Sequence, residues 1–487
     1  MTDERAGLGH ALLASASQAW RRGIASDVSS TMIGTVLGQI VLVAVSPVLT
    51  RLYSPAELGG FAVFLGLAAT LSVVGALGYQ LAIPLPTNRL IAANVTAVAV
   101  IALFVCSSII CLVAFGARWI GLTAPLGGLP WLLAPTVAAM SGFQILFMWT
   151  TREGDFRGAG VARLSQATAQ ALGQITAGLL RFGTAGLIAA YALAQFAGLG
   201  RLWRIARFPH SALSWGRMRA AALRYRKFPQ LTMWGSLANS AGTQLPAVLV
   251  GSLYGLTIAG EFSLAMRVLA LPAALLGQAF AQVFYPKAAA RAERPEQLQQ
   301  IVLRASGILL LGSLVCFVPI IALGGELFGL VFGARWEIAG QFGRWIAVWS
   351  AVALVSSPVS TLYLVVGRQG TGLIFSIADA IVKVLALVLG GWLGGAHMAI
   401  HAFAVTAAGS YLAFHVWTLR LVDLRLLTWL RGYWREAAAT VVVLGLMLGL
   451  RTRMPVLILW AAGTTLIGLA CWPSASRLLG EGAVRND

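Results

Sequence analysis

Charged side chains are scarce in this chain. They make up 10% of its 487 residues, whereas 59% are hydrophobic, and the mean hydropathy is +0.82. A soluble protein carries about 25% charged residues, so the composition excludes an ordinary soluble fold. Apolar runs of 18 or more residues recur from Val28 almost to the C-terminus, and each can cross a hydrocarbon core of about 30 Å as a helix. The runs lack the alternation of β-barrel strands, so they predict an all-α, polytopic membrane protein.

Sequence features of pumps and enzymes are missing as well. None of the three lysines ends a GxxxxG loop, which an ATP-driven pump needs to hold phosphate. A membrane glycosyltransferase or glycan polymerase would be expected to carry carboxylates in a sizeable outer loop, but the outer loops here are short, and the longest extramembrane loop is cytoplasmic and has no acidic residue. The four cysteines lie in apolar runs without CxxC spacing, which favours neither a metal site nor a disulfide framework. The sequence therefore predicts a transporter rather than an enzyme, with no cofactor and no metal.

The apolar runs divide into about fourteen predicted spans. The fifth and sixth lie close together and the thirteenth is short, so twelve spans plus interfacial pieces is the alternative. The predicted spans are 28–49, 58–84, 90–115, 129–150, 161–180, 184–203, 231–253, 262–285, 300–323, 340–364, 371–391, 397–418, 435–450 and 454–472.

Basic residues orient these spans. With the N-terminus inside, the inner segments carry 26 of the 35 Lys and Arg residues and the outer segments carry 7. The positive-inside rule therefore predicts that both termini are cytoplasmic. The formal charge of +19 is explained by this bias and by contact with anionic membrane lipid, so it does not require a nucleic-acid partner.

The chain divides into segments of different composition. Residues 1–27 are predicted to be a cytoplasmic N-terminal segment, 28–203 an N-terminal lobe of six spans, and 231–418 a second lobe of six. Residues 435–472 add a C-terminal helix pair and 473–487 a cytoplasmic tail. Between the lobes, the loop RLWRIARFPHSALSWGRMRAAALRYRKFPQ (201–230, of which 204–230 is the linker proper) has eight basic and no acidic residues. Its interleaved aromatic residues are more typical of a membrane-surface linker than of an RNA site.

The two lobes repeat a short pattern. Leu52-Tyr53, Gly59 and Phe61 match Leu253-Tyr254, Gly260 and Phe262 at an offset of 201. The first and seventh spans both run outward, so the repeats are parallel. Repeats of this kind place a transporter's substrate site between the two halves, near the bilayer midplane.

The first copy of the pattern belongs to a polar stretch between two apolar ones. Residues 45–64 read VSPVLTRLYSPAELGGFAVF and are predicted to form the outer turn between the first two spans. Pro55 is expected to stop the first helix, and Glu57 to lie in the first turn of the next, where the helix dipole favours an acid. Arg51 can reach the last carbonyls of the first helix. Arg51 and Glu57 are also candidates for gating.

Three strings resemble a known family. PVLTRLYSPAELGGFAVF, RYRKFPQLTMWGSLANSAGTQLPAVLVGSLYG (224–255) and GEFSLAMRVLALPAALLGQAFAQVFYPKAA (260–289) are similar to the polysaccharide-biosynthesis (oligosaccharide flippase) family of the multidrug/oligosaccharidyl-lipid/polysaccharide exporter superfamily. The resemblance covers most of residues 28–420. It implies a bacterial inner-membrane flippase for an undecaprenyl-pyrophosphate-linked oligosaccharide, used to assemble O-antigen, capsule or exopolysaccharide by alternating access. It also implies a polysaccharide polymerase and chain-length machinery as partners.

Three alternatives stay open beside this interpretation. A lipid II flippase of peptidoglycan synthesis shares the fold and the ligand head group. A drug antiporter of the same superfamily is less favoured, because many of these use a carboxylate in the first span and Asp27 precedes that span here. A membrane glycan polymerase is the least favoured class.

A glycan and a pyrophosphate together need amide groups and positive charge. Amide side chains both donate and accept hydrogen bonds, which suits sugar hydroxyls. In the fifth span Gln166, Gln170 and Gln174 follow one another at i, i+4 and i+8, and Arg163 lies one turn earlier on the same face. These residues are candidates for the wall of a substrate cavity; hydrogen bonding between helices is the alternative.

The eighth span carries a second polar stripe. Arg267 and Gln278 are eleven residues apart, about three helical turns, and Gln282 follows one turn later. A cation within a span costs about 2.5–3.5 kcal/mol on insertion scales. Arg267 is therefore either a ligand for anionic phosphate inside a cavity or a side chain that snorkels to the outer interface.

The eleventh span holds two opposite charges. Asp379 and Lys383 are spaced i, i+4, the geometry of a helical ion pair. They are either a structural pair or a coupling carboxylate with a cationic gate, and Lys383 is also a candidate for the substrate cavity. His397 and His401 share a face as well, but no third ligand accompanies them, so polar contacts are favoured over metal binding.

Overall fold

A computed structural model gives the fold of the chain. It describes residues 33–119, 130–209, 213–277, 280, 284, 288, 291, 294–360, 362–366 and 368–480, and all regular elements among them are helical. Ten of the helices are long and apolar enough to cross a membrane. The prediction of an all-α, multi-pass membrane protein is confirmed.

The number of spans stays a prediction, but the helices follow the predicted runs. One of the ten membrane-length helices, α15 (Gln369–Arg420), contains both the eleventh and the twelfth predicted spans. Its backbone leaves helical geometry at Gly394 and Gly395, where φ of Gly395 is 69°. The three other predicted spans correspond to α6 (Phe156–Leu179), α9 (Met233–Tyr254) and α17 (Trp434–Leu450). These three helices are more polar or shorter than the ten membrane-length helices.

Contacts within the chain define two compact units. The described parts of 33–45, 71–119 and 130–234 form the first unit, and those of 46–70 and 235–480 form the second. The six-span lobes predicted at 28–203 and 231–418 stay a prediction.

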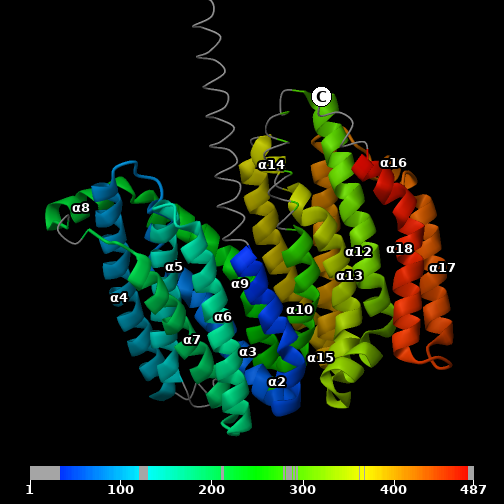
Figure 1. The fold of residues 1–487 in the computed structure, drawn as a ribbon, viewed down its shortest axis with the longest axis horizontal. Coiled ribbons are helices and arrows are strands. Elements are labelled where there is room, and N and C mark those ends of the chain that lie inside the picture. The colour runs from blue at the N-terminus through cyan, green and yellow to red at the C-terminus, as the bar shows by residue number, and fades with distance from the viewer. Residues whose placement is uncertain are drawn as a thin grey trace, which may run out of the picture. The chain divides into compact units, whose positions relative to one another are not determined.

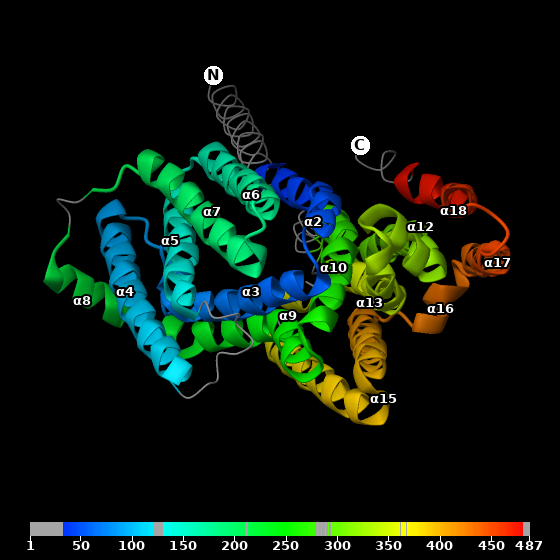
Figure 2. The same cartoon turned by 90° about the horizontal axis from the view of Figure 1, so that it is seen from below.

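In the first unit, α5 lies between α4 and α7 (Figure 2), and α7 also packs against α6. Gly34 lets the N-terminal helix, which begins at Ile33, approach α6 closely, because a Cβ at this position would fall on the backbone of Gly160. The basic linker contains a short helix, α8, whose Ala221 is buried in the cluster that includes Ala92 and Trp149. The other elements of this unit are α4 (Arg89–Trp119), α5 (Leu133–Arg152), α7 (Gly183–Ile205), α8 (Trp215–Arg224), the 3₁₀ turns η1 (Tyr79–Ala82) and η3 (Pro130–Leu132), and the π-helical turn η5 (Phe228–Thr232).

The second unit holds α2, most of α3, and the helices from α9 onward. The C-terminal pair α17 and α18 forms a hairpin at the side of α12 (Figure 1), and the three helices share a core that includes Val318, Met447 and Ile467. The elements are α2 (Ser46–Leu52), α3 (Pro55–Gly75), α10 (Leu256–Pro272), η6 (Ala273–Gly277), α12 (Pro295–Phe332), η7 (Ala334–Trp336), α13 (Glu337–Ser360), α14 (Leu362–Val365), α16 (Leu426–Arg431) and α18 (Val456–Gly480), besides α9, α15 and α17.

The polar turn between α2 and α3 forms a capping box. The backbone N–H and the hydroxyl of Ser54 donate to Glu57 Oε2, at 2.7 and 2.8 Å, and the N–H of Glu57 donates to Ser54 Oγ at 3.3 Å. The preceding helix, α2, ends at Leu52, shortly before Pro55, which is the first residue of α3. Its missing N–H and fixed φ suit the first helical position. Arg51 reaches back to the carbonyl of Pro47 at 2.8 Å, as expected.

The predicted second span is too long at its C-terminal end. It was expected to run to residue 84, but α3 ends at Gly75. Leu77 and Gly78 follow with φ of 51° and 78°, a left-handed conformation that ends a helix. Hydropathy alone does not detect this break, because the residues after it remain apolar.

The repeated glycines pack against each other in the second unit. A Cβ on Gly59 of α3 would fall on the carbonyl oxygen of Leu256, and a Cβ on Gly260 of α10 would fall on the carbonyl oxygen of Pro55. Equivalent positions of the two repeats therefore form one helix crossing in which backbone touches backbone. Small residues permit this kind of contact between membrane helices.

Gly260→Ala is expected to destabilise the protein by about 1–3 kcal/mol, because the added methyl group has backbone rather than a flexible side chain in its way. Thermal unfolding of the purified protein measures the effect. Gly445→Ala in α17 is the matched control, since its Cβ meets nothing within 4 Å and alanine is the better helix former. Equal unfolding temperatures for the two variants would contradict the crossing.

Candidate functional site

A cavity of about 290 Å³ in the second unit contains Arg267. We call it the arginine cavity. Its walls come from α2, α3, α9 and α10, and Arg267 is the one charged residue among the described residues that line it. Hydroxyl and amide groups accompany the guanidinium, from Ser46, Thr50, Thr243, Gln244 and Ser263.

Close helix packing sets the dimensions of the arginine cavity. The Gly59–Gly260 crossing brings α10 against α3, and a Cβ on Gly66 of α3 would collide with Val248 and with the carbonyl of Gln244 in α9. The polar side chains that line the cavity therefore come from helices whose backbones cannot separate without losing these contacts. The site is a preformed hollow with one cation and several hydroxyl groups.

A second cavity, of about 160 Å³, adjoins the first and shares Thr243 and Met266 with it. We call it the lysine cavity. The predicted helical ion pair lies in its wall, with Lys383 Nζ 2.6 Å from Asp379 Oδ2. Lys383 is 4% exposed.

Two aromatic rings complete the surroundings of the lysine. Lys383 Nζ lies 4.9 Å from the ring centroid of Trp349 and 5.1 Å from that of Tyr411. Aromatic faces attract a cation electrostatically, so the ammonium group is held by a carboxylate and two rings. Asp379 Oδ1 is buried and has no hydrogen-bond partner among the described residues, which leaves that oxygen able to accept a proton or a cation.

A third cavity, of about 170 Å³, shares Ser376, Asp379 and Tyr411 with the lysine cavity. Its other walls come from α14 and α15, including Tyr363 and Phe414. The three cavities thus follow one another through the second unit, and Asp379 lies at the boundary between the second and the third.

The other predicted cavity residues lie elsewhere or are not described. Gln278 and Gln282 fall outside the described residues. In the first unit, Gln166 donates a hydrogen bond to Gln195 of α7, while Gln170 and Gln174 are buried. The bond to Gln195 is the contact that the interhelical alternative expects.

Arg163 is packed against two aromatic rings of α5. Its guanidinium carbon lies 4.9 Å from the ring centroid of Phe143 and 4.7 Å from that of Phe147. Arg163 and Lys383 thus share one kind of environment, a cation held by aromatic faces, although they belong to different units. Local spacing does not reveal either pair of rings, because Phe143, Phe147 and Trp349 lie on other helices than the cations. Tyr411 shares α15 with Lys383 but lies beyond the break at Gly394 and Gly395.

The turn between α2 and α3 has contacts that spacing alone does not reveal. Arg335 Nη2 donates to the carbonyl oxygens of Thr50 and Arg51, at 2.6 and 2.8 Å, and the indole N–H of Trp336 donates to Thr50 at 3.0 Å. These bonds satisfy carbonyls at the end of α2. Arg51 and Glu57 make local helix-end contacts here, and their role in gating stays a prediction.

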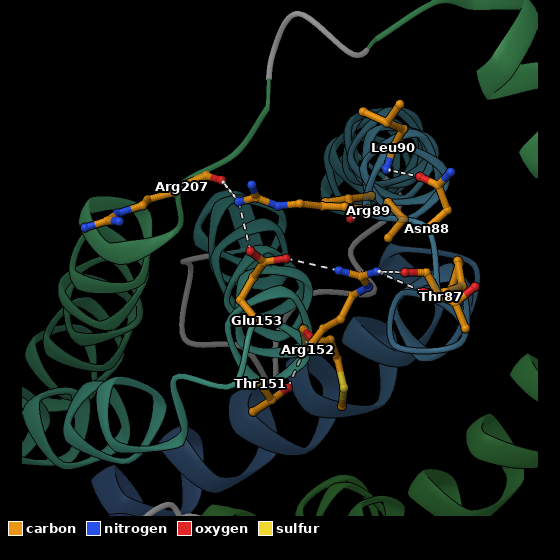
Figure 3. Close-up of polar contacts among 12 residues, drawn as sticks. Thr87, Asn88, Arg89, Leu90, Thr151, Arg152, Glu153 and Arg207 are labelled. Carbon is orange, nitrogen blue, oxygen red and sulfur yellow. Dashed lines mark hydrogen bonds and ion pairs between the residues drawn. The ribbon is translucent and has the colours of Figure 1, made fainter.

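A polar cluster in the first unit was also missed (Figure 3). Glu153, at the end of α5, accepts from Arg89 at 2.8 Å and from Arg152 at 3.0 Å. Arg89 also donates to the carbonyl of Arg207, and Arg152 to that of Pro86. The cluster ties two loops of the unit to the end of α5, so its arginines do more than mark the positive side of the membrane.

The sequence of this chain is similar to those of two bacterial polysaccharide biosynthesis proteins. The chain is 21% identical over 161 residues to the lipopolysaccharide biosynthesis protein WzxC of Escherichia coli (strain K12), which covers 33% of each chain. It is 22% identical over 149 residues to the amylovoran biosynthesis protein AmsL of Erwinia amylovora, covering 31% of this chain and 38% of that one. The matches thus span little more than a third of these relatives' length.

Similarity in fold extends over nearly the whole chain. The solved structure of the lipid II flippase MurJ in an inward closed conformation superposes with a TM-score of 0.73, covering 93% of this chain and 99% of that one at 10% identity. The family described as polysaccharide biosynthesis protein matches residues 48–340, which include most of α2 and all of α3, α9 and α10, the helices of the arginine cavity. The chain belongs to the polysaccharide biosynthesis protein family.

Proposed function

We propose that this protein is a flippase that moves a lipid-linked oligosaccharide across the bacterial inner membrane for surface polysaccharide assembly. The family match over residues 48–340 carries the proposal, and the flippase fold supports it. The lipid carrier is undecaprenyl pyrophosphate, the glycan is a repeat unit of O-antigen, capsule or exopolysaccharide, and translocation proceeds by alternating access.

The arginine cavity suits the pyrophosphate part of such a substrate. A guanidinium is planar and permanently charged, and it binds phosphate oxygens through two N–H groups at once. The hydroxyl and amide groups beside Arg267 supply further donors. Because the cavity lies among membrane helices, a charged phosphate inside it gains more from the cation than it would in water.

The orientation of the protein is part of the proposal. The excess of Lys and Arg on the inner segments supports cytoplasmic N- and C-termini and a cytoplasmic 201–230 linker. The same charges favour anionic lipid at that surface. A reporter fused at residue 215 that gave a periplasmic signal would contradict this orientation.

A reconstitution assay tests the function. Purified protein is placed in vesicles that contain a polyprenyl-pyrophosphate-linked oligosaccharide labelled on its sugar, and the fraction accessible to a membrane-impermeant glycosidase is followed in time. We expect the accessible fraction to rise well above the half that faces outward in protein-free vesicles. No increase over protein-free vesicles would contradict the proposal.

Lipid II is the second candidate substrate, favoured by the TM-score of 0.73 to a lipid II flippase. The same assay with labelled lipid II separates the two. Faster movement of the oligosaccharide repeat unit supports surface-polysaccharide assembly, and faster movement of lipid II assigns the protein to peptidoglycan synthesis. A free labelled oligosaccharide is the control, because it lacks the pyrophosphate on which the arginine cavity would act.

A further inference from the structure

A separate cavity lies at the C-terminal hairpin, away from the three described above. It has a volume of about 480 Å³ and is formed by the beginning of α12, by α16 and the two residues that follow it, Gly432 and Tyr433, and by the end of α18. Figure 1 shows α16 at the end of the bundle where α12 begins and α18 ends. None of its described lining residues belongs to the arginine, lysine or third cavity. We call it the C-terminal cavity.

The cavity lies at a level of the protein where a lipid head group could reach it. It lies where membrane-length helices end, since α12 starts at Pro295 and α18 finishes at Gly480. Trp429 and Tyr433 line it, and these amphipathic rings are typical of the membrane–water boundary. Leu427 of α16 is 71% exposed and Leu430 is exposed as well, so apolar side chains are available to lipid beside the polar opening.

The lining of the cavity carries positive charge. Arg304 and Arg477 both line it, and none of the described lining residues is acidic. Arg477 donates from Nη2 to Ser474 Oγ at 3.0 Å and from Nε to the carbonyl of Pro473 at 3.1 Å. These bonds use two of its five N–H groups and hold the guanidinium at the cavity.

The buried carboxylate of Glu436 orients Ser474, which in turn binds Arg477. The hydroxyl of Ser474 donates to Glu436, which is 5% exposed, while the same oxygen accepts from Arg477. Burial, and to a lesser extent the charge of Glu436, raise the pKa of Tyr433. The phenol hydroxyl lies beside Gly307 of α12 and stays protonated at neutral pH, as an ordinary tyrosine does. Ser474 acts as a positioning residue, between the carboxylate and the arginine.

We propose that the C-terminal cavity binds the phosphate group of a membrane lipid, with Arg304 and Arg477 as its charged contacts. The hydroxyl groups of Thr428 and Tyr433, which also line the cavity, would add neutral donors. The combination of two guanidinium groups, aromatic boundary residues and exposed leucines fits a ligand that has an anionic head and an apolar tail. The inference does not depend on the glycan flippase assignment, because it concerns a cavity with different walls.

Lipid retention by the full-length protein tests the site. The protein is purified, mixed with phosphatidylglycerol or with phosphatidylcholine of the same acyl chains, and analysed by native mass spectrometry. We expect phosphatidylglycerol to be retained in preference, and the double variant Arg304→Gln/Arg477→Gln to lower that retention at least about tenfold, because two charge-assisted contacts are lost. Ser474→Ala, which frees Arg477, should lower it to a smaller extent.

Arg431→Gln is the matched control. It removes one positive charge from the last turn of α16, where Arg431 is exposed and does not line the cavity, so retention should be unchanged. If the double variant unfolds, the single Arg477→Gln variant replaces it, since that side chain is exposed. Equal retention by wild type and the arginine variants, or equal loss in Arg431→Gln, would overturn the proposal.

Two further arms identify the source of the phosphate. A polyprenyl pyrophosphate that outcompetes phosphatidylglycerol, and is lost in the same double variant, assigns the cavity to the carrier lipid. Displacement of the lipid by millimolar inorganic phosphate would overturn the lipid part of the proposal, because the acyl chains would then contribute nothing. The flippase assay on the double variant is independent of these results, so failure of the lipid site leaves the proposed function standing.

Discussion

Arg267→Ala is expected to reduce glycan translocation by about tenfold to hundredfold, with the amount of protein in the membrane unchanged. Arg267 is the one charged residue among the described residues of the arginine cavity, where it accompanies several hydroxyl groups. A hydrogen bond to a charged group contributes about 1.5–3 kcal/mol, and a factor of ten corresponds to about 1.4 kcal/mol. The vesicle assay measures the initial rate of glycosidase access.

The chemistry of the replacement distinguishes a phosphate ligand from a membrane anchor. Lysine should restore part of the rate, because it keeps the charge and loses the two-pronged geometry, whereas glutamine should not. Arg453→Ala removes an exposed arginine between α17 and α18 and is the matched control. Normal rates for both the alanine and the glutamine variants would mean that Arg267 only snorkels to the interface.

In that case Lys383 becomes the next candidate for the phosphate contact. Arg163 was an equal candidate on sequence alone, but its guanidinium packs against Phe143 and Phe147. Arg163 lines none of the three cavities, whereas Lys383 lines the lysine cavity. The structure therefore favours Lys383 over Arg163 as a phosphate ligand, a choice that the sequence left open.

Elements that depend on composition and local spacing were predictable from the sequence. Apolar runs placed the membrane helices, because a helix must be apolar along its length to cross lipid. The four-residue spacing of Asp379 and Lys383 predicted their ion pair, because residues at that spacing are neighbours on a helix. Arg51 was likewise expected to reach a carbonyl of its own helix. Each of these contacts joins residues that are close in sequence.

Contacts between distant residues were not predictable in the same way. The match of Gly59 with Gly260 indicated an internal repeat, but not that the two glycines touch. Trp349 lies on α13, and Tyr411 lies beyond the break at Gly394 and Gly395 in α15, so nothing local linked either ring to Lys383. The left-handed turn after Gly75 depends on backbone conformation, which leaves no trace in hydropathy.

The crossing of α3 and α10 at Gly59 and Gly260 connects the internal repeat with the arginine cavity. Because Gly59 and Gly260 allow α3 and α10 to meet backbone to backbone, the side chains next to them, Phe61 and Phe262, reach the wall of the arginine cavity. Both phenylalanines belong to the repeated pattern. The positions that revealed the duplication are therefore also positions that shape the candidate site.

Asp379→Asn is expected both to destabilise the protein and to reduce translocation. It leaves the ammonium of Lys383, which is 4% exposed, without its carboxylate, and breaking a buried ion pair in this way costs about 3–5 kcal/mol. The double variant Asp379→Asn/Lys383→Met removes both charges and should recover most of the unfolding temperature. We expect its translocation rate to stay at least about tenfold low, because a carboxylate oxygen at position 379 that can accept a proton or cation would still be missing.

A charge-swapped variant separates a structural pair from a functional carboxylate. Asp379→Lys/Lys383→Asp keeps two opposite charges at i, i+4 and therefore keeps their mutual neutralisation. Asp379 lines both the lysine cavity and the third cavity, whereas Lys383 lines only the lysine cavity of these two. The swap therefore moves the carboxylate away from the boundary between them. Thermal unfolding and the vesicle assay are measured on the same preparations. A swapped protein that is stable but slow supports a coupling role for Asp379, whereas one that transports at the wild-type rate shows that the pair is structural.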